Sequence, residues 1–183
     1  KMSESKSGEK HPMYGKHLPE ETRKKITARI LDAQDTVHTI GKLTDDFPEL
    51  GVDEGYEVQD ELRRTWIARG DRQVGVKAGL TSKPKMEQMG VKLPGFGLLM
   101  ASMSRPENGV IEMDQLIHPR IEAEIAFVLK DELSGADLSI EQVIAATDYV
   151  IPAVEVIDSR FEKFKFDLPS VIADNTSSAR YVT

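Results

Sequence analysis

The sequence of 183 residues contains no cysteine, and this absence excludes disulfides, thiolate zinc sites and a cysteine nucleophile. No apolar run approaches the roughly 18 residues of a membrane span, and residues 1–12 lack the apolar core of a signal peptide. The four histidines form no cluster, and a net charge of −7 gives no indication of nucleic-acid binding. We therefore expect a cytoplasmic protein that binds neither a membrane nor a nucleic acid.

Composition and apolar spacing predict one globular domain with a helical N-terminal region. The chain is 39% hydrophobic and 30% charged, which provides enough apolar sequence for a core. Residues 1–18 are predicted to be a mobile polar tail. In residues 19–72, apolar residues recur at helical spacing in a helix that begins at Pro19 and in a second helix from about Val52 to Arg69.

Residues 73–183 change in character and are predicted to form a β-rich domain that carries the catalytic site. Short helices are expected up to Met89 and near 139–147, and Pro94–Gly97 is predicted to be a loop. The expected strands occupy residues 74–80, 98–103, 121–129, 148–160 and 177–183. A helical cap followed by a β-rich part is typical of an α+β fold.

Two glutamates one residue apart, Glu122 and Glu124, lie in the apolar segment from Ile121 to Leu129. Residues i and i+2 of a strand point to the same face, so the two carboxylates stand side by side. Because neighbouring carboxylates repel each other and resist desolvation, they need a cation or must hold a proton. All-oxygen ligands favour a hard divalent ion such as Mg²⁺ or Mn²⁺. An edge strand whose polar face lies in water is the alternative.

A third acid, Glu155, lies between Val154 and Val156 in another apolar segment. A lone glutamate at such a position usually means a paired core charge or a mistaken strand prediction. Two strands that each carry acid within Val/Ile-rich sequence fit a shared three-carboxylate site better than two separate accidents. The 31 residues from Glu124 to Glu155 leave room for the intervening helix. We therefore favour a metal site.

Four segments in order resemble the fumarylacetoacetate hydrolase superfamily: residues 75–82, 118–125, 152–160 and 172–178. Within it they are similar to the branch of 2-keto-4-pentenoate hydratases and 4-oxalocrotonate decarboxylases, which acts in the meta-cleavage catabolism of aromatic compounds. The resemblance covers about residues 40–183 and implies mixed sheets that form a barrel-like roll. Members of the family continue past the equivalent of Thr183, so we expect the C-terminal strands of that fold to be missing.

The resemblance assigns roles to particular residues. Glu122, Glu124 and Glu155 match the metal-binding carboxylates of the family, which hold Mg²⁺ or Mn²⁺. Lys77 matches the catalytic, proton-handling lysine of its Gly-x-Lys-x-Gly-Leu-Thr-Ser motif, although a lysine at a strand end can also reach solvent. The residues expected to bind substrate are Leu80, Thr81, Ser82, Phe96, Arg160, Asn175 and Ser177.

Some of these substrate-binding assignments have alternatives. Asn175 and Ser177 fit an Asx or Ser turn about equally well. Arg160, together with Lys163 and Lys165, is a candidate for holding the second carboxylate of a dicarboxylate. Charges that alternate with aromatic residues also indicate a half-buried strand.

The substrates of this branch are 2-oxo acids, whose carboxylate and ketone chelate one metal ion that acts as a Lewis acid on the ketone oxygen. The hydratases carry an acid in Pro-Asp-Phe-Gly where this chain has Gly95, and the stretch 156–168 is more similar to the decarboxylases. We therefore expect metal-dependent decarboxylation of 2-oxo-3-hexenedioate (4-oxalocrotonate) to 2-hydroxypenta-2,4-dienoate and CO₂.

Other functions stay open. The hydratase that acts on 2-hydroxypenta-2,4-dienoate is the first alternative, and a non-catalytic fragment or partner subunit of a hydratase–decarboxylase complex is another. A hydrolase of acylpyruvates would need a water-activating base, for which His118 is a poor candidate because Pro119 follows it just before the strand. The resemblance also implies a homo-oligomer and a complex with the pathway hydratase.

Overall fold

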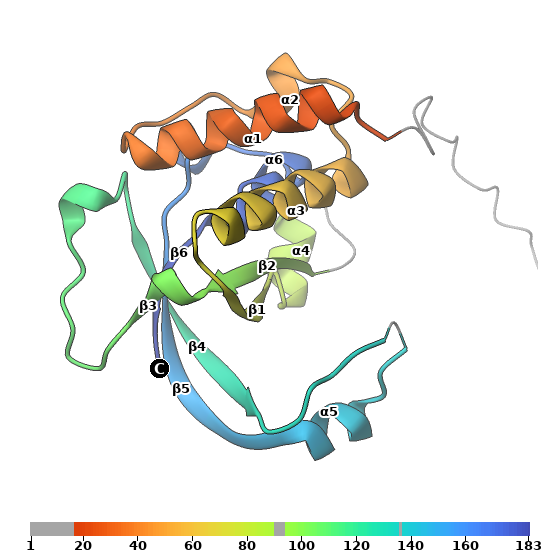
Figure 1. Ribbon diagram of the computed structural model, residues 1–183, viewed down its shortest axis with the longest axis vertical. Helices are drawn as coiled ribbons and strands as arrows, with labels where there is room; N and C mark the ends of the chain where they lie inside the picture. The colour runs from red at the N-terminus through yellow and green to blue at the C-terminus, as the bar shows by residue number, and fades with distance from the viewer. Residues whose placement is uncertain (1–16, 90–93, 136) are drawn as a thin grey trace, which may run out of the picture.

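The computed structural model describes residues 17–89, 94–135 and 137–183, so the predicted tail lies almost entirely outside the described residues. Helices α1, α2, α3 and α6 lie together at one end, and β4 and β5 extend away from them (Figure 1). The helices are α1 (Glu20–Asp35), α2 (Leu43–Asp46), α3 (Val52–Ala68), α4 (Lys83–Met89), α5 (Ile140–Ala146) and α6 (Leu168–Ala173). The strands are β1 (Gln73–Gly79), β2 (Gly95–Met100), β3 (Ser104–Arg105), β4 (Arg120–Leu129), β5 (Thr147–Ile157) and β6 (Ser178–Val182).

The two long helices, α1 and α3, pack together through one apolar stripe each. Ile26 and Ile30 of α1 and Val58 and Leu62 of α3 are fully buried, and the spacing of four residues puts each pair on one helix face. Both helices are confirmed within a few residues of the predicted bounds. None of the described helices is long and apolar enough to cross a membrane.

The core of the helical region continues into the β-rich part. Leu98 and Met100 of β2 belong to the same buried cluster as the helices, and so do Phe161 and Ala173. The two regions therefore share one hydrophobic core across residue 72. The boundary between them at that residue stays a prediction.

The strands form two open sheets. β1 and β2 make an antiparallel pair, and the second sheet has the order β3-β6-β5-β4. In that second sheet β3 is parallel to β6, and the other neighbours are antiparallel. The α+β architecture with mixed strand directions is confirmed. The barrel-like roll is not, because β4 pairs only with β5 and the described strands close no barrel.

The bounds of β2 differ from the prediction. Pro94–Gly97 was expected to be a loop, but Gly95 pairs with Gly79 and starts the strand. Glycine marks a close backbone approach here, because a Cβ atom at Gly97 would lie 2.9 Å from the carbonyl oxygen of Asn175. The strand ends at Met100, where a 3₁₀ turn takes the chain away from β1.

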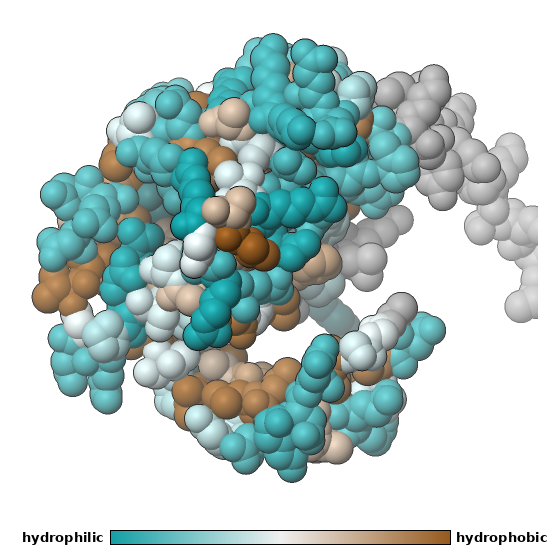
Figure 2. All heavy atoms as spheres, viewed as in Figure 1, coloured by the Kyte–Doolittle hydropathy of each residue, from teal (hydrophilic) through white to brown (hydrophobic). Residues whose placement is uncertain are grey.

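The strands β4 and β5 form a curved arm that carries α5 at its far end (Figure 1). Figure 2 shows apolar side chains gathered along this arm. The register puts alternate residues of both strands on one face, where Val156 is buried but five other large apolar residues are at least 39% exposed. These residues, called the apolar arm face below, are Ile121, Ile125, Phe127, Val150 and Val154.

Candidate metal centre

The register between β4 and β5 brings the three acids of the sequence prediction together. Glu122 lies directly opposite Glu155, and Glu124 lies two residues along on the same face. One oxygen from each carboxylate lies within 4.8 Å of the others. The structure therefore forms the cluster that the spacing predicted, while the role of the three residues as metal ligands stays a prediction.

The cluster combines three negative charges with one positive charge. Glu155 is buried and accepts hydrogen bonds from Lys77 Nζ and from Ser178 Oγ, both at 2.9 Å. Glu122 and Glu124 are exposed. Burial raises the pKa of Glu124, and the charges of Glu155 and Glu122 raise it further, whereas Lys77 lowers it. The excess of negative charge favours a bound cation.

The donor set fits a hard divalent cation. The three carboxylates supply only oxygen ligands, which Mg²⁺ and Mn²⁺ prefer. Mg²⁺ usually keeps several non-protein ligands, and the exposure of Glu122 and Glu124 leaves room for water or substrate oxygens. Glu122, Glu124 and Glu155 would hold the ion.

Lys77 reaches the cluster from β1. It pairs with Gly97 of β2, and its side chain is only 12% exposed. Besides Glu155, the ammonium group donates to the carbonyl oxygen of Thr176 at 3.3 Å. The alternative of a lysine that only reaches solvent therefore does not hold. A role for Lys77 in catalysis stays a prediction.

Asn175 and Ser177 lie in a 3₁₀ turn, but their described side-chain hydrogen bonds are not those of an Asx or Ser turn. Asn175 clamps β2, because Oδ1 accepts from Leu98 N at 2.7 Å and Nδ2 donates to Leu98 O at 2.9 Å. Ser177 Oγ donates to Asp174 Oδ2 at 3.4 Å. Both residues have a positive φ within a 3₁₀ turn. Their polar groups hold the backbone next to the cluster, and substrate contact stays a prediction.

The other residues predicted to bind substrate lie around the β1–β2 hairpin. Phe96 is exposed and stacks on Tyr56, with ring centroids 4.4 Å apart. Leu80, Thr81 and Ser82 follow β1, and Leu80 has a φ of 59°. All four positions flank the strand that carries Lys77, and their role in substrate binding stays a prediction.

Arg160 has other partners than the expected substrate carboxylate. It is buried, and its guanidinium donates to the carboxylate and the carbonyl oxygen of Asp174 and, at 2.7 Å, to the carbonyl oxygen of Asp158. These acceptors hold the guanidinium within the fold. A role for Arg160 in substrate binding stays a prediction. Lys163, considered with it, is exposed beside Glu162.

Ser178 makes a contact with Glu155 that the sequence does not indicate. Its buried hydroxyl donates to Glu155 and so holds the oxygen that Lys77 does not. The residue lies at the start of the predicted last strand, within the last of the four motifs, but a single serine there indicates no partner. Its position depends on the irregular register between β5 and β6 near Ile157, which the sequence does not reveal.

Comparison with known proteins shows that most of the chain is similar to decarboxylases and hydratases. The 4-oxalocrotonate decarboxylase of Pseudomonas sp. (strain CF600) is 53% identical over 158 residues, which is 86% of this chain and 60% of that protein. The 2-hydroxyhexa-2,4-dienoate hydratase of Comamonas testosteroni is 37% identical over 156 residues, 84% of this chain and 59% of that protein. Over these residues the chain is similar to these decarboxylases and hydratases. The predicted resemblance to this branch is confirmed.

A solved structure of the family agrees with the fold. The 4-oxalocrotonate decarboxylase from Pseudomonas putida G7, complexed with magnesium and adipate, matches with a TM-score of 0.87 at 52% identity, over 91% of this chain and 63% of that chain. The chain thus spans about 60% of the length of the curated decarboxylases that it matches. A family model described as the NUMOD3 motif matches residues 1–27, most of which lie outside the described residues.

Proposed function

We propose that this chain carries the metal-binding part of a 4-oxalocrotonate decarboxylase, which converts 2-oxo-3-hexenedioate into 2-hydroxypenta-2,4-dienoate and CO₂ with Mg²⁺ or Mn²⁺. The cluster of Glu122, Glu124 and Glu155 beside Lys77 is the observation that carries the proposal. Identity of 53% to a decarboxylase against 37% to a hydratase supports the choice of reaction. A fumarylacetoacetate hydrolase-like fold is part of the same proposal.

The residues of the cluster have separate tasks in this reaction. A divalent ion held by the three glutamates would supply a Lewis acid for the ketone oxygen of the substrate. The bond between C5 and the C6 carboxylate breaks, CO₂ leaves, and the electron pair passes along the conjugated chain to the C2 oxygen. Lys77, which Glu155 and Thr176 hold in place, donates a proton to that oxygen to give the enol product.

Gly95 supports decarboxylation over hydration. The resemblance gives the hydratases an acid at this position, and glycine cannot transfer a proton. The position has room for a side chain, since the nearest neighbours of an added Cβ atom would be Thr176 and Tyr56 at 3.9 and 4.0 Å. The space around Gly95 would therefore admit a side chain, and the acid of the hydratases is absent only because the sequence has glycine here.

The reaction is tested with the purified chain, 2-oxo-3-hexenedioate and Mg²⁺. We expect equimolar CO₂ for the substrate consumed, and EDTA should stop the reaction. Lys77→Met should still bind the metal in calorimetry but lose turnover. Lys24→Met, at an exposed lysine of α1, is the matched control and should keep both.

Two other outcomes have defined meanings. Hydration of 2-hydroxypenta-2,4-dienoate to 4-hydroxy-2-oxopentanoate, without CO₂ from the dicarboxylate, would assign the chain to the hydratases. Neither activity would support the non-catalytic fragment or partner subunit. Full turnover of Lys77→Met would leave this lysine with a structural role.

Small 2-oxo acids and other protein chains are the partners in this proposal. The solved homologue contains adipate, a saturated dicarboxylate, which supports a dicarboxylate substrate. The apolar arm face supports a homo-oligomer or a complex with the pathway hydratase, because large exposed apolar patches are typical of interfaces. Light scattering of the chain alone and mixed with the hydratase distinguishes the two.

A further inference from the structure

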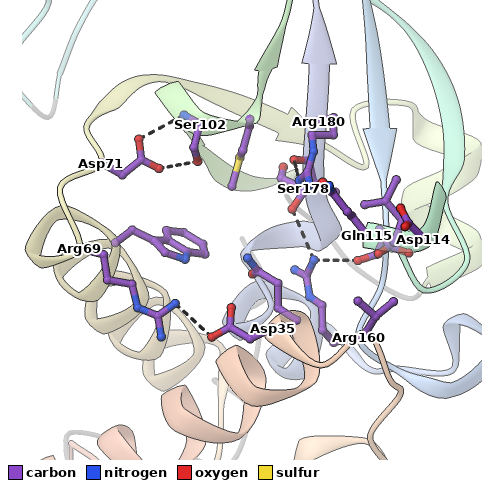
Figure 3. Close-up of a pocket in the computed structure, with 16 residues that line it drawn as sticks. Asp35, Arg69, Asp71, Ser102, Asp114, Gln115, Arg160, Ser178 and Arg180 are labelled. Atoms are coloured by element: carbon purple, nitrogen blue, oxygen red, sulfur yellow. Dashed lines mark hydrogen bonds and ion pairs between the residues drawn. The ribbon is translucent and has the colours of Figure 1, made fainter. Parts of the chain in front are cut away.

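A cavity of about 480 Å³ lies between the C-terminal ends of α1 and α3 and the start of β6 (Figure 3). The 3₁₀ turns Ala101–Met103 and Met113–Gln115 complete its wall. Ser178 separates this cavity from the candidate metal centre. Its hydroxyl donates to Glu155, whereas its carbonyl accepts from Arg160, which lines the cavity. None of the three clustered glutamates lines the cavity, so the two sites are distinct.

Most charged side chains around the cavity are already satisfied. Arg69 donates to Asp35 at 3.2 Å, and Asp71 accepts from the Ser102 hydroxyl at 2.6 Å (Figure 3). Asp158 accepts from two backbone N–H groups, both at 2.8 Å. The buried guanidinium of Arg160 forms an ion pair with Asp174, which does not line the cavity. Arg69 and Arg160 are therefore neutralised by ion pairs, whereas Asp71 and Asp158 are stabilised by hydrogen bonds from a hydroxyl and from backbone N–H groups.

Arg180 is different. Its partly buried guanidinium donates only to Ala179 O at 2.9 Å and Gln115 Oε1 at 3.4 Å, and no carboxylate of the described residues forms an ion pair with it. Burial lowers the pKa of Arg180 and the like charge of Arg105 lowers it further, although Asp158 opposes the shift. A partly desolvated cation that lies near a second cation and forms no ion pair within the described residues favours an anionic ligand.

The remaining lining suits the body of an organic molecule. Trp66, Met103, Leu116 and Ala179 are buried apolar residues that face the same cavity. Asp114 lies in the exposed part of the lining. The cavity thus has a predominantly polar lining with one apolar patch, and its volume lies in the range of small-molecule sites.

We propose that this cavity binds a small organic anion, whose carboxylate pairs with Arg180 and whose apolar body packs against Trp66 and Met103. A carboxylate matches the two parallel N–H donors of a guanidinium, which an ammonium group does not offer. The site requires neither a metal ion nor Lys77, so it is independent of the proposed decarboxylation.

The chain offers a direct reporter, because Trp66 is the only tryptophan of the sequence. Benzoate titrated into the full chain in EDTA should change the Trp66 fluorescence saturably. The neutral analogue benzamide should bind at least about tenfold more weakly than benzoate, because it lacks the charge-assisted hydrogen bond. Arg180→Gln should weaken benzoate binding by about the same factor, and Arg180→Lys should be intermediate.

Controls separate this site from others. Arg64→Gln removes an exposed arginine of α3 outside the cavity and should leave benzoate binding unchanged. Lys77→Met should also leave it unchanged, and loss of the signal in that variant would move binding to the metal centre and overturn the proposal. Three other results would also overturn the proposal. They are the absence of a saturable fluorescence change in the parent, equal affinity of the parent for benzamide and benzoate, and equal benzoate affinity in Arg180→Gln and the parent. If Arg180→Gln does not fold, the comparison between parent and Arg180→Lys decides, and equal affinities there overturn the proposal as well.

Discussion

The helical half and the β4–β5 arm contain similar apolar side chains but bury them differently. Ile30 of α1 and Leu62 of α3 are 0% exposed, whereas Ile121 and Ile125 of β4 are 76% and 67% exposed. Both regions have regular apolar spacing, every three to four residues in the helices and every two in the strands. The spacing therefore identifies side chains that share a face, but burial depends on whether another layer covers that face.

Polar groups follow the same division. In the helical half and its neighbour α6, the buried charges of Arg160 and Asp174 are paired with each other. On the arm, Glu122 and Glu124 are exposed beside the buried Glu155. Charges near the helices are therefore enclosed and paired, and the capacity to bind a cation lies where carboxylates face solvent.

The largest effect is expected from breaking the enclosed pair. Asp174→Asn leaves the guanidinium of Arg160 buried without a counter-charge, which should lower the free energy of unfolding by about 3–5 kcal/mol. Burial raises the pKa of Asp174 to about 6 although Arg160 opposes the shift, so urea denaturation should be measured well above that pH. Asp35→Asn, which removes an exposed partner of Arg69, should cost at most about 1 kcal/mol. Equal losses in the two variants would contradict this division.

The second prediction compares equal truncations in the two regions. Leu62→Ala should lower the free energy of unfolding by about 2–5 kcal/mol because it leaves a cavity in the core. In a monomeric chain, Ile125→Ala should change it by no more than about 0.5 kcal/mol because the side chain is exposed. Urea denaturation followed by circular dichroism gives both values. A large loss in Ile125→Ala would show that another layer covers the apolar arm face in solution, as the proposed oligomer requires.

Local sequence patterns were sufficient for most of the elements and for the three acids. The helical stripes of α1 and α3 and the i, i+2 spacing of Glu122 and Glu124 are properties of short segments, and both were predicted correctly. The addition of Glu155 depended on its unusual position between two valines. The register that puts it opposite Glu122 follows from pairing over the whole length of the two strands.

Contacts between distant segments account for the errors. The sequence predicts a loop at Gly95 and Gly97, because the approach of Asn175 that requires a glycine at position 97 comes from another part of the chain. The sequence does not indicate that Arg160 pairs with Asp174, because the two residues are 14 positions apart. Ser178 carried no signal, because its contact with Glu155 arises only after β6 pairs with β5.

The third prediction concerns the hydroxyl that holds Glu155. Ser178→Ala removes a 2.9 Å hydrogen bond to one carboxylate oxygen while Lys77 keeps the other. Loss of such an orienting contact typically weakens metal binding by about tenfold or more, which calorimetry with Mg²⁺ should detect. Ser178→Thr should restore most of the affinity, and Ser102→Ala, at an exposed serine away from the cluster, should have no effect. An unchanged affinity in Ser178→Ala would remove this residue from the site.

The smallest effect is a shift in the pH dependence of metal binding. Burial and the charges of Glu155 and Glu122 raise the pKa of Glu124 above the ordinary value of 4.5. Protons compete with the metal ion for a carboxylate, so Mg²⁺ affinity should be maximal at neutral pH. As the pH is lowered, the affinity should start to fall at a higher pH than it would for a site of ordinary glutamates. Calorimetry at a series of pH values measures this decline. Glu124→Gln should bind Mg²⁺ more weakly at neutral pH, and its remaining decline should start at a lower pH because the raised carboxyl group is gone. A decline in the parent that starts only near pH 4.5 would mean that the three carboxylates do not crowd one another in solution.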